Sequence, residues 1–376
     1  MRITDVKVSV FEIERGQRIF DLVLLPGMGR DRWVHDNATH QPGHLQVMQV
    51  TTDEGVEGLC EVPPLPGPMS EQSLKQLRHL VVGENPLDRE RLYQKLHAGT
   101  RWVYYHQGWA GTFDNCLWDI VGKAAELPVH AIIGRVRDSA PVYMNIGGDT
   151  RDLAAEDAAR AVAAGYPAVK DHFYHSVAEN IRWFQAIREA VGPNVDLMHD
   201  PVAIYSLEQA IRVGRALEEL DYRWLEEPLP ERHHSRMKAL CDALDIPVLA
   251  PETMMNDVDL SAQWLISGAT DMLRANARHG TTPVLKLAHL AELHGTSIEL
   301  NGTGGLGGLV HAHLLASISN TTYYEYFGGA HEQASREIGM TNPIVPQGGR
   351  IAPPDGPGWG AEWDLDYFEA KRAAEI

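Results

Sequence analysis

Three acidic side chains stand at equal intervals along the chain. The interval from Asp200 to Glu226 is 26 residues, and the interval from Glu226 to Glu252 is again 26 residues. Any one of them could be a solvated carboxylate at the end of a strand, but the matched spacing argues against three such coincidences. Three converging carboxylates would repel one another strongly without a cation between them. Oxygen-only ligands suit Mg²⁺, with Mn²⁺ as an alternative.

The elements around these residues explain how they could meet. From about residue 140, short β-rich runs alternate with longer helical runs. Eight such units predict an α/β fold with a parallel sheet, for which a closed TIM (β/α) barrel is the usual solution at this length. One unit is about as long as the interval between the carboxylates, so all three would stand at the C-terminal mouth, where barrel enzymes place their chemistry. A doubly wound open sheet is the alternative, although no GxGxxG follows the first strand. The expected strands are 142–145, 168–170, 195–198, 223–225, 248–250, 271–274, 296–300 and 323–326.

The N-terminal third has a different pattern. An irregular stretch, 25–42, separates two alternating runs, and a long connection of this kind is often functional. We expect it to form a lid over the barrel mouth, with Arg32, Trp33 and His35 as substrate contacts, although single Arg and His residues on loops are usually only solvated. The other elements expected here are strands at 3–10 and 44–50 and helices at 70–98 and 113–125.

Composition limits the possible partners. The chain has 376 residues, which suits a barrel with a companion domain, and a net charge of −18, which argues against nucleic acid. A small carboxylate substrate remains compatible, because a bound metal reverses the local field. The three cysteines form no CxxC pair, and neither a secretory h-region nor an apolar run of about 18 residues is present. We therefore expect a cytoplasmic protein that does not contact a membrane.

One motif resembles a known family. The run Trp224-Leu225-Glu226-Glu227-Pro228 resembles the WxEEP signature of the enolase superfamily, and segments 117–124, 197–200 and 353–358 agree with it. The resemblance spans nearly the whole chain and is closest to the mandelate racemase-like branch, because the three carboxylates are Asp, Glu and Glu. It implies Mg²⁺-assisted removal of the proton α to a substrate carboxylate, and a homo-oligomer. It also implies an α+β capping domain at 1–130, with the lid at about 25–42, a modified barrel at 131–328 and a C-terminal segment at 329–376 that packs back on the cap.

The proton-transfer residues depart from the family pattern. Where the family often has Lys-x-Lys on the second strand, this chain has Lys170-Asp171-His172. Residues two apart on a strand share a face, so both Lys170 and His172 can enter the barrel mouth. The resemblance then implies that Lys170 is catalytic and lies near the metal and the substrate carboxylate. His172, assisted by Lys170, would be the base, because its unperturbed pKa is nearer neutrality than that of lysine.

The Asp–His dyad of many branch members is absent. Asn276 stands at the sixth-strand position, and Glu299-Leu300-Asn301 replaces the expected histidine on the seventh strand. Asn276 and Asn301 are candidate substrate contacts, and Glu299 is a candidate acid. Glu325 matches a position where a protonated glutamate could donate to the enediolate oxygen. Its alternative role is a buried partner for Arg or Lys.

Together with these residues, the resemblance implies an enzyme, most simply a lyase that dehydrates an acid sugar, aldonate or aldarate, to a 2-keto-3-deoxy acid. Dehydration needs one strong base if the same residue can protonate the leaving group. Racemisation or epimerisation needs groups on both faces and is the runner-up, followed by lactone cycloisomerisation. A barrel that binds metal and ligand without turnover is the alternative from another class.

Overall fold

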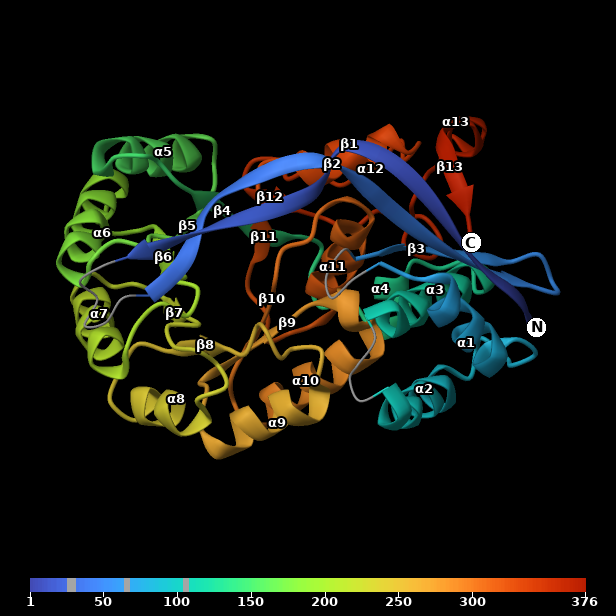
Figure 1. Ribbon diagram of the computed structural model, residues 1–376, viewed down its shortest axis with the longest axis horizontal. Coiled ribbons are helices and arrows are strands. Elements are labelled where there is room, and N and C mark those ends of the chain that lie inside the picture. Colours follow the sequence, from blue (N-terminus) through green and yellow to red (C-terminus); the bar gives the residue numbers. More distant parts are fainter. Residues whose placement is uncertain (26–31, 64–67, 104–107) are drawn as a thin grey trace.

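The computed structural model describes residues 1–25, 32–63, 68–103 and 108–376. Figure 1 shows a barrel of short strands ringed by helices, with a β-rich cap beside it and a long hairpin that crosses over the barrel.

The barrel contains all eight expected strands. They are parallel and follow one another in chain order from β4 to β10, and β11 pairs with β4 on the other side. The two-residue strand β12 (Arg350–Ile351) adds an antiparallel pair to β4. The α/β barrel prediction is therefore confirmed. The strands are β4 (Ala140–Ile146), β5 (Ala168–Asp171), β6 (Asp196–His199), β7 (Trp224–Glu226), β8 (Val248–Ala250), β9 (Met272–Ala275), β10 (Ile298–Leu300) and β11 (Tyr324–Tyr326).

A seam between β10 and β11 completes the barrel. The Ile298 N–H donates to the Asn320 carbonyl at 3.0 Å. The buried Glu299 carboxylate accepts the N–H groups of Thr322 and Tyr323, at 3.1 and 3.2 Å. A side chain thus accepts the N–H groups that precede β11.

The helices cover the outside of the barrel with apolar stripes. Helix α7 buries Ala210, Val213 and Leu217, a helical spacing, and begins with a capping box between Ser206 and Gln209. Among the described residues, none of the helices combines the length and apolarity needed to cross a lipid bilayer. The barrel helices are α5 (Arg151–Ala163), α6 (Val177–Val191), α7 (Leu207–Glu219), α8 (His234–Cys241), α9 (Val258–Ser267), α10 (Thr281–Leu293) and α11 (Gly305–Ser317), with a 3₁₀ turn η1 (Ala277–His279) after β9.

The barrel core has an apolar layer below a charged one. Following five members of the apolar layer, the residue two positions further along the chain is charged and buried: Lys170, Asp200, Glu226, Arg274 and Glu325. Because alternate residues of a strand share a face, these side chains lie one level nearer the C-terminal mouth. The apolar layer consists of Tyr143, Ala168, Met198, Trp224, Leu249, Met272 and Tyr323.

The cap is built from both ends of the chain. Its antiparallel sheet has the order β13-β1-β2-β3, so the last strand pairs with the first. The prediction of an irregular stretch at 25–42 is wrong where it can be checked, because β2 begins at Arg32 and pairs Trp33 with Leu24. Residues 26–31 lie outside the described part. The cap elements are β1 (Ile3–Leu25), β2 (Arg32–Thr52), β3 (Glu57–Val62), β13 (Arg372–Glu375), α1 (Glu71–Val81), α2 (Arg89–Val103) and α3 (Gly108–Ala124), with α4 (Val129–Ile133), α12 (Ala330–Glu337) and α13 (Leu365–Lys371) nearby.

Asp119 joins the cap helix α3 to the returning tail. Its carboxylate accepts the Trp359 N–H and the Leu59 N–H, each at 3.0 Å, and pairs with Lys123 at 2.7 Å. A Cβ on Gly122 would meet the Gly358 Cα at 2.5 Å, so only glycine allows this approach. The family-like segments 117–124 and 353–358 therefore meet in space.

Candidate active site

Lys170 is the centre of the charged layer. It is 1% exposed, and its Nζ lies 2.7 Å from Glu325, 3.0 Å from Glu226 and 3.3 Å from Asp200. Three strand ends thus converge on one ammonium group, as the equal spacing of the carboxylates predicts for two of them.

Arg274 is a second bridging cation that the sequence analysis did not identify. It is fully buried, and its guanidinium lies 2.7 Å from Glu325, 2.9 Å from Glu226 and 3.5 Å from Glu252. The signal was available, because Arg274 stands two residues before Asn276 and therefore shares its inward face. An arginine within an apolar strand requires nearby anions.

Glu252 is held by the side-chain amides of two asparagines and by the carboxylate of Glu231. The Asn301 amide donates to Glu252 at 3.0 Å, and the Asn276 amide donates to the carbonyl and side-chain oxygens of Asn301 at 3.0 and 3.1 Å. The buried Glu231 carboxylate accepts the N–H of Glu252, and the N–H of Thr253 at 2.8 Å together with its hydroxyl. Asn276 and Asn301 therefore orient the Glu252 side chain, and Glu231 fixes its backbone.

His172 and Glu252 are the accessible members of the group, each with a side chain that is 28% exposed. The Nε2 of His172 lies 3.2 Å from Asp200. Burial lowers the pKa of His172, but the attraction of Asp200 outweighs it, so the pKa is raised overall. His172 is therefore the candidate proton-transfer group that a substrate can reach.

Charge in this layer is only partly balanced. Four carboxylates, Asp200, Glu226, Glu252 and Glu325, face the permanent cations of Lys170 and Arg274. Burial raises the pKa of Glu226 to about 7 in spite of both cations, and burial also raises the pKa of Glu252. A divalent cation would supply the two missing positive charges.

The donor set fits Mg²⁺. Asp200, Glu226 and Glu252 offer only carboxylate oxygens, the ligands that a hard divalent ion prefers. In the described part of the chain, no three carboxylate, imidazole or thiolate groups converge closely enough to hold an ion as they stand. Lys170 and Arg274 instead bridge the carboxylates.

Glu325 differs from its predicted role as a neutral acid. Burial would raise its pKa, but Lys170 and Arg274 outweigh this effect and hold it well below its usual range. Its carboxylate is the buried ion-pair partner of Lys170 and Arg274, at 2.7 Å from each, which was the alternative role.

Glu299 is also not where the prediction requires it. Both of its carboxylate oxygens accept backbone N–H groups just before β11, one of them from Tyr323 of the apolar layer. The prediction of a substrate-facing acid at Glu299 is wrong, and this residue is part of the seam.

The three lid residues remain apart from this group. Trp33 is 67% exposed, and the side chains of Arg32 and His35 lie outside what the structure describes.

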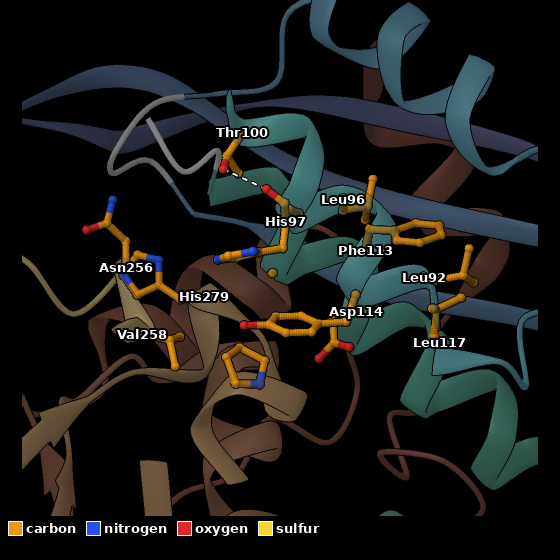
Figure 2. Close-up of a pocket in the computed structure, with 14 residues that line it drawn as sticks. Leu92, Leu96, His97, Thr100, Phe113, Asp114, Leu117, Asn256, Val258 and His279 are labelled. Atoms are coloured by element: carbon orange, nitrogen blue, oxygen red, sulfur yellow. Dashed lines mark hydrogen bonds between the residues drawn. The ribbon is translucent and has the colours of Figure 1, made fainter. Parts of the chain in front are cut away.

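A small cavity lies between the cap and the loops that follow β8 and β9 (Figure 2). It measures about 50 Å³ and is lined by α2 and α3 together with Asn256, Val258 and His279. Pockets for small organic ligands measure about 300 Å³ or more. The cavity is therefore too small for an acid sugar, and no member of the charged layer lines it.

The fold and the charged layer define an enolase-type barrel with a cap. Residues 33–134 match the N-terminal domain family of mandelate racemase / muconate lactonizing enzyme, and residues 153–367 match the enolase C-terminal domain-like family. The chain belongs to this mandelate racemase-like family of the enolase superfamily.

Its relatives include acid-sugar dehydratases. The L-talarate/galactarate dehydratase of Salmonella typhimurium is 30% identical over 266 residues, 67% of this chain and 65% of that protein. A D-galactonate dehydratase family member of Catenulispora acidiphila is 27% identical over 320 residues, 76% of this chain and 74% of that protein. Among solved structures, D-glucarate dehydratase from Agrobacterium tumefaciens complexed with magnesium has a TM-score of 0.83 and 30% identity, with 100% of both chains covered.

Proposed function

We propose that the protein is a Mg²⁺-dependent hydro-lyase that removes water from an acid sugar, an aldonate or an aldarate, to give a 2-keto-3-deoxy acid. The similarity to acid-sugar dehydratases supports this reaction class. The single observation that carries it is the position of His172, an accessible imidazole beside a buried layer of carboxylates and cations.

Asp200, Glu226 and Glu252 would hold the ion, which when bound stabilises the negative charge that develops on the substrate carboxylate as its α-proton leaves. Lys170 and Arg274 keep these side chains oriented from below, because each contacts two of the three. Glu231 holds the backbone that presents Glu252.

His172 carries the proton. It accepts the α-proton of the substrate, and the carboxylate of Asp200 at 3.2 Å stabilises the imidazolium that forms. The same imidazolium then returns the proton to the β-hydroxyl as its C–O bond breaks. Water leaves, and the remaining enol becomes the 2-keto acid by a proton shift from oxygen to carbon.

The residues at the positions of the Asp–His dyad favour dehydration over racemisation. At the two dyad positions the structure has Asn276 and Asn301, whose amides do not titrate, and Glu299 faces the seam. Racemisation needs a second acid/base group on the opposite face of the α-carbon. The described residues at these positions offer none.

The test is incubation with Mg²⁺ and a panel of acid sugars in D₂O, with 2-keto acid formation and α-proton exchange as readouts. We expect His172→Asn to lower turnover by about 10³-fold, within the range for loss of a general base. The melting temperature and the Mg²⁺ affinity should stay within error of the wild type.

His175→Asn is the matched control, because this histidine lies on the same loop but packs at a tilt against Trp183, with ring centroids 4.2 Å apart. It should retain activity. Unimpaired turnover by His172→Asn would remove His172 from the mechanism. Exchange without keto acid would indicate an isomerase, and silence across the panel would favour a binding role.

A further inference from the structure

Two arginines, one in β9 and the other in the turn that follows it, have very different surroundings. Arg274 has three carboxylates within 3.5 Å. Arg278, one turn further on in η1, has none within 4.0 Å among the described residues. Its guanidinium instead donates through Nε to Nε2 of His279 at 3.3 Å.

A chain of hydrogen bonds connects the backbone of Arg278 to Glu252, one of the candidate metal ligands. Its backbone N–H donates to the Asn276 side chain at 2.8 Å. Asn276 in turn binds Asn301, and Asn301 binds Glu252. Arg278 is therefore tied through two asparagines to the turn that carries Glu252.

The charge of Arg278 is poorly compensated. Burial lowers its pKa, Glu252 raises it and Arg274 lowers it again, with a net decrease. A guanidinium that has lost part of its hydration without gaining a carboxylate is unfavourable on its own, and a bound anion relieves this cost.

The other cations of the site are already engaged. Lys170 and Arg274 each contact three protein carboxylates, and the candidate metal would be taken by the carboxylate beside the reacting carbon. A substrate with a second carboxylate needs another cation. Arg278 is a half-buried cation that follows β9 and has no carboxylate within 4.0 Å among the described residues.

We propose that Arg278 binds the distal carboxylate of the substrate, so that the enzyme selects aldarates over aldonates. This inference rests on the proposed dehydratase function. The two Nη groups of a guanidinium match the two oxygens of a carboxylate, while His279 holds Nε. A terminal CH₂OH can occupy the same place but offers no charge and only one oxygen.

The test compares substrates that differ only at the distal carbon. Galactarate and D-galactonate form one such pair, and D-glucarate and D-gluconate form another. We expect the wild type to show a kcat/KM roughly a hundredfold higher for the diacid of the preferred pair. Arg278→Met should lower the value for the diacid by roughly a hundredfold and that for the aldonate by less than about threefold. Arg278→Lys keeps the charge without the fork and should lie between them.

The control is Arg223→Met, which removes a cation that pairs with Asp196 at 2.8 Å at the opposite end of the barrel. It should leave the ratio of the two kcat/KM values unchanged. An equal loss on both substrates in Arg278→Met, or a wild type that prefers the aldonate, overturns the inference and leaves the dehydratase function intact. If Arg278→Met does not fold, an unchanged ratio in Arg278→Lys overturns it. A wild type that dehydrates none of these acids contradicts the proposed function itself.

Discussion

Glu299 and Glu325 lie on either side of the seam of the barrel and are equally buried, at 0% and 2% exposure. Backbone N–H groups surround Glu299, and burial still raises its pKa overall. Lys170 and Arg274 surround Glu325 and lower its pKa in spite of burial. Amide dipoles satisfy the hydrogen bonds of a carboxylate without cancelling its charge, whereas cations do both. Glu299 therefore has a structural role at the seam, whereas Glu325 balances the charges of the two buried cations.

The largest effect expected within this comparison separates the two glutamates. Glu325→Gln removes the charge that two buried cations require, so kcat/KM should fall by about 10²-fold or more and the free energy of unfolding by about 3 kcal/mol. Glu299→Gln keeps an acceptor for the β11 N–H groups, so activity should change by less than about threefold and stability by about 1 kcal/mol.

Steady-state kinetics and urea unfolding measure both quantities. Comparable losses of activity in the two variants would contradict the comparison, because they would show that Glu299 also contributes to catalysis.

A smaller effect is expected at Glu231, which accepts three hydrogen bonds from the turn that carries Glu252. Glu231→Ala should weaken Mg²⁺ binding by about 10- to 100-fold, the usual cost of losing a residue that orients a ligand. Calorimetric titration of the protein with Mg²⁺ alone reports this without turnover.

Thr253→Ser keeps the hydroxyl that Glu231 accepts and should bind Mg²⁺ like the wild type. An unaltered Mg²⁺ affinity in Glu231→Ala, with only a lower melting temperature, would reduce Glu231 to a structural residue.

The smallest effect tests how far the positive charge of the layer reaches. His311 is buried, and its Nε2 accepts the Ala277 N–H at 3.0 Å. Burial lowers its pKa to about 3, with Arg278 and Arg274 adding to the decrease. Because the folded pKa lies below the unfolded value of 6.5, the stabilisation is complete above pH 6.5 and is lost as the pH falls towards 3.

His311→Gln keeps the acceptor and does not titrate. Between pH 7 and pH 5 the wild type should lose about 1–2 kcal/mol more unfolding free energy than this variant, measured by urea unfolding. Parallel pH dependence in the two proteins would show that His311 is not held neutral.

The strand ends could be predicted because they repeat. Equal intervals between Asp200, Glu226 and Glu252 reflect one β/α unit each, and a parallel barrel brings equal positions to the same edge. The cations Lys170 and Arg274 do not follow from this repeat. Lys170 was found through a family motif, and Arg274 was missed because a strand of apolar character was interpreted only as a strand.

Glu299 shows why inward direction is not enough. Its alternation with Asn301 gave the correct face, but two residues along a strand cover about 6–7 Å. That distance places Glu299 at the level of the apolar layer, beside the residues that precede β11. The hairpin also extends further than predicted, to the pair of Leu24 and Trp33. One strand alone does not predict this extension, because the pairing register depends on both strands.

The pairing of β13 with β1 has a consequence for biosynthesis. Residues 372–375 are translated after every barrel strand, yet they complete the sheet that begins at Ile3. During synthesis the N-terminal hairpin must wait, with one sheet edge unpaired, while the whole barrel emerges. Such an edge invites pairing with other chains. A ribosome-bound chain stopped before residue 372 should therefore be captured by chaperones for longer than the finished protein.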